Sequence, residues 1–208
     1  MAVSLEAPGS VRAFVPPAPP KTAKAAETRR RLLELAANLF IERSYHAVSM
    51  RDLGAAAALT TGAVYGHFRS KGQLLVEVIR WKIAERDRVI DYDKARSNPD
   101  YGISLMYDNL GRDTRLLEVD AAAAARHDPE VAAGLLSLYG ERQKQIRDAL
   151  SHVVDPDAAV WVLTALQAGI GMKESIELPT LEAKRLTTAI AAAIGGLVAQ
   201  GDSDPPLA

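Results

Sequence analysis

Two helix-capping signals that lie close together constrain the fold of this chain more than any other feature of its sequence. Ser49, followed by Asp52, predicts the start of a helix over about Met50–Ala57. Thr60 predicts the cap of another short helix, which runs to about Phe68. Two helices this short cannot bury an apolar face alone, so they must pack against each other and against a third element. The segment therefore predicts a compact helical module.

Small residues lie where these two helices would have to cross. Ala58 and Leu59 form the turn, and Gly54 and Ala57 leave room for the second helix to pack across the first. This spacing is typical of a helix-turn-helix, whose second helix can enter the major groove of DNA. Three apolar residues are spaced to fill the core between the helices, namely Leu53, Leu59 and Val64.

The rest of the chain is predicted to be helical too. Alternating runs rich in Val, Ile and Thr are missing, as are Asn-Gly and Asp-Gly turns. A first helix ends near Arg43, and a Ser70–Gln73 capping box opens a long fourth helix that reaches Asp91 or beyond. One face of the first helix is apolar, with Leu32, Ala36, Leu39 and Phe40. Later helices are predicted over about 101–110, 114–126, 129–152 and 156–175, and from 179 to 195 or 200.

Charge is distributed unevenly along the chain. The net charge is −1, but the stretch Lys21–Lys82 carries eleven Lys and Arg against five Asp and Glu, a net +6. The residues after Lys82 carry −7, because Glu6 and Arg12 cancel in the first twenty residues. A basic segment beside an acidic one is typical of a module that binds phosphate, joined to one that does not.

The block from Val48 to Leu75 contains a pattern of residues at fixed spacing: Ser49, Arg51, Asp52, Leu53, Val64, Tyr65, His67, Phe68, Ser70, Lys71 and Leu74. This pattern resembles the N-terminal domain of the TetR family of transcriptional regulators. With the first helix, the resemblance covers about residues 28–76. Two departures from the family pattern are Ala58, where the family has Gly, and Gly54, where Ala is usual. Gly66 stands where relatives often carry a polar or aromatic side chain.

The resemblance implies a DNA-binding surface on this block. Lys71 and the N-cap hydroxyls are expected to meet phosphates, and the first turn of the recognition helix to approach base edges. Arg51 could instead pair with Asp52 or Glu42. The expected DNA-binding residues are Ser49, Arg51, Thr60, Thr61, Gly62, Tyr65, His67 and Lys71.

For the C-terminal half, the resemblance implies a helical bundle that binds a small-molecule effector and forms a homodimer. The interface helices would be about 129–152 with 156–175 or the final helix. Aromatic and methionine side chains favour a largely apolar effector. The expected pocket residues are Trp81, Tyr101, Met106, Tyr107, Leu110, Leu117, Trp161 and Met172.

These inferences combine into one prediction. The fold is all-α, with about nine or ten helices: a disordered arm (1–20), a three-helix DNA-binding domain (21–76), a helical ligand-binding and dimerisation domain (77–200) and a flexible tail (201–208). The function is that of an operator-binding regulator, expected to be a repressor whose affinity for a palindromic operator changes with the effector. The alternatives are a DNA-binding protein without a ligand and, with less support, a helical enzyme.

Several other classes of protein find no support in the sequence. The chain has no cysteine, its four histidines have no metal-ligand spacing, and no nucleotide-binding or nucleophile motif occurs. We therefore expect no metal, no cofactor and no catalytic residues. The absence of a long apolar run or a secretion signal predicts a cytoplasmic protein without a membrane partner.

Overall fold

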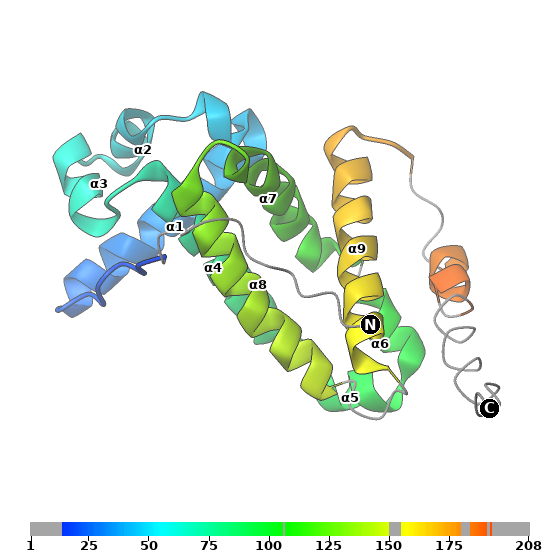
Figure 1. Cartoon of the computed structure of the whole chain (residues 1–208). Coiled ribbons are helices and arrows are strands. Elements are labelled where there is room, and N and C mark those ends of the chain that lie inside the picture. Colours follow the sequence, from blue (N-terminus) through cyan, green and yellow to red (C-terminus); the bar gives the residue numbers. More distant parts are fainter. Residues whose placement is uncertain (1–13, 106, 150–154, 180–183, 191, 193–208) are drawn as a thin grey trace, which may run out of the picture. The chain divides into compact units, whose positions relative to one another are not determined.

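The computed structural model describes residues 14–105, 107–149, 155–179, 184–190 and 192. Within this part of the chain all regular structure is helical, which confirms the all-α prediction, and residues 184–190 add a helical stretch. The elements are α1 (Ala23–Arg43), the 3-10 turn η1 (Tyr45–Ala47), α2 (Met50–Ala57), α3 (Thr61–His67), α4 (Lys71–Asp87), α5 (Tyr92–Ser97), α6 (Pro99–Ser104), α7 (Asn109–Ala125), α8 (Pro129–Ala149) and α9 (Pro156–Ser175) (Figure 1). None of the described helices is long and apolar enough to cross a membrane.

The chain divides into two compact units. Unit 1 comprises Met1–Val78 and Asp120–Tyr139, and unit 2 comprises Ile79–Val119 and Gly140–Ala208. The helices α4, α7 and α8 contribute residues to both units. The helix-turn-helix predicted from the sequence lies wholly in unit 1.

The core of unit 1 forms where α1, α2, α3 and α4 bring their apolar side chains together. Leu32 and Ala36 of α1 are fully buried and Phe40 is 1% exposed, as their spacing predicts, whereas Leu39 is half-buried. The start of α4 is buried on every face. Apart from Gln73 and Glu77, its buried side chains are apolar, as expected for a helix in the interior of a protein. Its wholly buried residues in this unit are Leu74, Leu75, Val76 and Val78.

The segment after α4 differs from the sequence prediction. α4 ends at Asp87, and two short helices, α5 and α6, follow before α7. The break predicted at Ser97–Asp100 is also a helix start, because the Asn98 side chain accepts a hydrogen bond from the Tyr101 amide at 3.1 Å. Pro99 then occupies the first helical position, where its missing N–H costs nothing. The end of the helix predicted over about 129–152, at residues 150–152, lies outside the described residues.

The expectation of a disordered arm covers residues 1–20, of which 1–13 lie outside the described part. Residues 14–20 form no helix but contact the body of unit 1. The sequence contains no local signal for this docking, because the partners of the segment come from α1 and α4.

Candidate nucleic-acid interface

The start of α2 is fixed by a reciprocal pair of side-chain bonds. Ser49 Oγ accepts from the Asp52 amide at 3.2 Å, and Asp52 Oδ2 accepts from the Ser49 amide at 2.8 Å. This capping box confirms the cap predicted from the sequence. The bonds from Ser49 favour the carboxylate and lower the pKa of Asp52.

The turn between α2 and α3 contains an alanine in a left-handed conformation. Ala58 has φ 55° and ψ 41°, and the amides of Ala58 and Leu59 bond back to Ala55 O and Gly54 O. Only glycine adopts this region at little cost. The position where the family carries glycine therefore does need a positive φ here, and alanine strains the turn.

We expect Ala58→Gly to raise the free energy of unfolding by about 1 kcal/mol, because it relieves this strain. Urea denaturation monitored by circular dichroism would measure the change. The matched control is Ala56→Gly at an exposed position inside α2, which should lower stability by about 1 kcal/mol. A loss of stability in both variants would mean that the turn does not adopt the left-handed conformation.

Gly54 allows α2 and α3 to pack as closely as they do. A Cβ atom at this position would lie 2.9 Å from Leu59 O and 3.4 Å from Thr61 N, both of which are backbone atoms. The second departure from the family pattern thus has a local reason, since a side chain here would push the backbone of the turn away. The small-residue crossing predicted from the sequence is confirmed at Gly54.

Helix α3 presents one face to the protein and another to solvent. Val64 is fully buried, whereas Gly62, Tyr65 and Gly66 lie on the opposite side and are exposed, Tyr65 by 50%. Thr60 Oγ1 accepts from the Ala63 amide at 3.1 Å, which caps the helix and leaves the hydroxyl hydrogen free to donate to a phosphate. We call the surface of Thr60, Gly62, Tyr65 and Gly66 the recognition face.

The other predicted contact residues lie at the edges of this face or beside it. Thr61 and His67 are half-buried. Arg51 is exposed, and within the described part of the chain no ion pair engages it, so the predicted alternative of pairing with Asp52 or Glu42 is not formed. Its charge still lowers the pKa of Asp52.

Lys71 makes contacts inside unit 1 that the sequence did not predict. Its ammonium donates to Tyr45 O and Val48 O, both at 3.1 Å, and lies 4.2 Å from the centroid of the Tyr45 ring. Burial lowers the pKa of Lys71, and burial raises the pKa of Tyr45 to about 12. An ammonium group has three donors, so one remains for a phosphate. The phosphate contact stays a prediction.

In unit 2 the residues expected to line a ligand pocket differ widely in burial. Leu117 is buried, Tyr107 packs with Leu163, Leu166 and Leu186 around Ile190, and Trp81 and Tyr101 are half-buried. Trp161 and Met172 are 71% and 64% exposed in the single chain, so they line no enclosed cavity of one protomer. Met106 and the side chain of Leu110 lie outside the described part.

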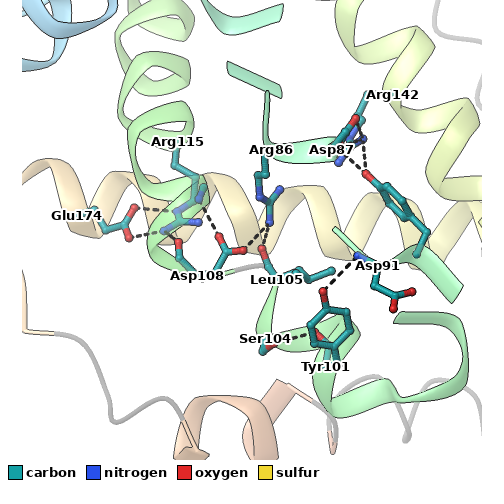
Figure 2. A network of polar contacts seen from close by, with 12 residues as sticks. Arg86, Asp87, Asp91, Tyr101, Ser104, Leu105, Asp108, Arg115, Arg142 and Glu174 are labelled. Atoms are coloured by element: carbon teal, nitrogen blue, oxygen red, sulfur yellow. Dashed lines mark hydrogen bonds and ion pairs between the residues drawn. The ribbon is translucent and has the colours of Figure 1, made fainter. Parts of the chain in front are cut away.

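A network of buried ion pairs in unit 2 was not predicted from the sequence (Figure 2). Arg115 of α7 forms a bidentate pair with Glu174 of α9, at 2.8 and 2.6 Å, with side chains 4% and 11% exposed. Arg115 also donates to Asp108 O at 3.0 Å, and Asp108 faces Arg86 at 3.5 Å. The sequence signal for a close approach of helices here was Gly171. In the structure, a Cβ atom at this position would lie 3.1 Å from Arg115 Cβ.

Two short helices that cross at a tight turn, with a capped second helix exposed on one face, define a helix-turn-helix module. Residues 32–78 match the model for bacterial regulatory proteins of the tetR family. The N-terminal block of this chain therefore matches the TetR-type helix-turn-helix, as its sequence predicts.

Among curated relatives, the chain is 35% identical over 78 residues to the HTH-type transcriptional repressor KstR2 of Mycolicibacterium smegmatis. This match covers 36% of the chain and 38% of the relative, so it spans well under half of either protein.

Similarity in fold extends further than similarity in sequence. A TetR-family regulator from Rhodococcus sp. superposes with a TM-score of 0.69 at 17% identity, over 83% of this chain and 99% of that one. AibR, solved in complex with isovaleryl coenzyme A and operator DNA, superposes with a TM-score of 0.53 at 18% identity, over 80% and 97%. Most of the chain therefore shares the fold of these regulators.

Proposed function

We propose that the protein is a sequence-specific DNA-binding transcriptional regulator that acts as a repressor. The observation that carries this proposal is the recognition face, which the caps and the left-handed turn hold exposed within the TetR-type block. The basic stretch 21–82 supplies charge for phosphates. The eight predicted DNA-binding residues keep their proposed roles, with Lys71 offering one remaining donor.

Selection of bound sequences from random duplex DNA tests this proposal. We expect a palindromic consensus with half-sites about one helical turn apart, because two recognition helices read such sites in symmetric dimers. Affinity should fall steeply with salt concentration, since phosphate contacts release counterions. Binding without sequence preference would contradict the proposal.

We further propose that the protein forms a homodimer through α9. Trp161, Ala165, Ala168 and Met172 are spaced to fall on one face of this helix, and all four are exposed in the single chain. The alanines would allow a second helix to approach closely, and the larger residues would supply apolar area. This face lies on one of the helices that the sequence indicates for the interface.

Ala165→Glu should separate the dimer, because it places a charge inside an apolar contact while glutamate remains a good helix former. Sedimentation equilibrium should give twice the chain mass for the wild type and one chain mass for the variant. Ala84→Glu, at an exposed alanine of α4, is the matched control and should remain dimeric. A wild-type monomer, or a dimeric Ala165→Glu, would contradict the proposal.

The proposed function includes a largely apolar small-molecule effector that changes the affinity for the operator. The support is the half-buried aromatic set of Trp81, Tyr101 and Tyr107 in unit 2, within the proposed 77–200 domain. Domain boundaries at 21–76 and 77–200 remain part of this proposal. Thermal-shift screening against metabolites distinguishes the sensor from a DNA-binding protein without a ligand, which no compound would stabilise.

A further inference from the structure

The segment Phe14–Pro20, which we call the N-terminal strap, contacts three helices of unit 1. Val15 O accepts from Gln73 Nε2 of α4 at 2.8 Å, and Ala18 O accepts from Arg29 Nη1 of α1 at 3.1 Å. Phe14 packs at Gly134 of α8, where a Cβ would lie 2.9 Å from Phe14 Cδ2. The strap therefore joins elements that are distant in the sequence.

Gln73 connects the strap to the chain that leaves the recognition helix. Gln73 is only 2% exposed, and both the nitrogen and the oxygen of its side-chain amide form hydrogen bonds. Nε2 donates to Val15 O, while Oε1 accepts from the Arg69 amide at 2.9 Å. Arg69 directly follows Phe68, the C-cap of α3, so one buried amide links the strap to the end of that helix.

Arg29 makes a second connection of the same kind. Besides its bond to Ala18 O, it pairs with Glu77 of α4 at 2.9 Å, with side chains 15% and 9% exposed. Its guanidinium also lies 5.2 Å from the centroid of the Phe68 ring. The strap, α1, α4 and the C-cap of α3 thus meet around one cation.

Proline lowers the entropic cost of holding the strap in place. Four of its seven residues are prolines: Pro16, Pro17, Pro19 and Pro20. Because each ring fixes φ, the unbound segment is already extended and loses little freedom on docking. A segment with this composition can stay docked through a few contacts.

We propose that the N-terminal strap positions the recognition helix, with Gln73 and Arg29 as positioning residues that touch no DNA. The strap holds the segment between α3 and α4 in one conformation, so the recognition face is ordered before DNA arrives. Preorganisation of this kind raises affinity because less freedom is lost on binding. The proposal rests on the DNA-binding function proposed above.

Two full-length variants test the strap. Gln73→Met keeps the size of the side chain but removes both hydrogen bonds, and Phe14→Ala removes the contact at Gly134. We expect each to speed hydrogen exchange of the Arg69 amide and to weaken binding to the selected operator by about tenfold, because a less ordered recognition helix loses more freedom on binding. Gln143→Met, at an exposed glutamine of α8, is the matched control and should change neither.

The salt dependence of binding separates positioning from direct contact with DNA. A positioning role leaves the slope of log K against log salt unchanged, because no phosphate contact is lost. A shallower slope, wild-type affinity or wild-type Arg69 exchange in both variants would each overturn the proposal. Hydrogen exchange of the Arg69 amide is measured without DNA. If the wild-type protein bound no operator, the proposed function would be refuted, but the exchange rates of the variants would still test whether the strap holds the segment between α3 and α4.

Discussion

Gly66→Glu should weaken operator binding by about 100-fold without lowering the stability of the protein. Gly66 is exposed on the recognition face, and a Cβ built there meets nothing within 4 Å, so the new side chain has no steric cost. Glutamate is also a better helix former than glycine. Its carboxylate, however, would face phosphates, and like-charge contacts across an interface cost several kcal/mol. Fluorescence anisotropy with the selected operator would measure the loss.

Gly66→Lys is the matched opposite of this change. It should strengthen binding and steepen the salt dependence by about one unit, because it adds one phosphate contact at a position where the chain offers none. Thermal denaturation should show all three proteins to be folded. If Gly66→Glu and Gly66→Lys changed operator affinity equally, the charge at this position would not affect binding, and α3 would then not lie against DNA.

Glu174→Ala should lower the free energy of unfolding by about 3–5 kcal/mol, because it removes the bidentate carboxylate partner from the buried guanidinium of Arg115. Arg115 would keep its bond to Asp108 O but lose two charge-assisted hydrogen bonds. Urea denaturation would measure the loss. Glu174→Gln keeps the shape of the side chain and one acceptor, so it should lower the free energy of unfolding by less. The difference between the two variants would separate the effect of charge from that of packing.

Glu85→Ala is the control for this second prediction. Glu85 pairs with Arg88 on the surface of α4, with side chains 45% and 72% exposed, and such pairs contribute about 0–1 kcal/mol. If Glu174→Ala were no more destabilising than Glu85→Ala, the Arg115–Glu174 pair would not be buried in the folded protein.

Much of the DNA-binding module could be predicted because its determinants are local. Ser49 and Thr60 cap helices through bonds to amides three residues away, so the sequence pattern and the structure contain the same information. The strain at Ala58 was foreseeable from the resemblance, because the family carries glycine at this position, and the structure gives Ala58 a positive φ. The start of α9 at Pro156 followed from the cap at Asp155 in the same way.

Features that depend on long-range contacts could not be predicted. Lys71 was expected to meet a phosphate, and nothing in the sequence indicated that its ammonium also donates to carbonyls of residues 45 and 48. The ligand-pocket prediction treated Trp161 and Met172 as interior residues from their type alone, although both side chains are exposed in the single chain. Residue type indicates what a side chain can do, but burial depends on which helices pack against it.

The sequence by itself predicted an all-α chain with a helix-turn-helix block at about residues 28–76, since caps, turns and apolar periodicity act within a few residues. The helices of the described residues and the family match over 32–78 agree with this prediction. Only the tertiary structure decided which charges are buried, where the N-terminal strap lies and which residues of α3 stay exposed. Arg115 and Glu174, or Gln73 and Val15, are brought together by packing of whole elements. No local sequence pattern predicts such a pairing, because the interaction forms only when packing removes both partners from water.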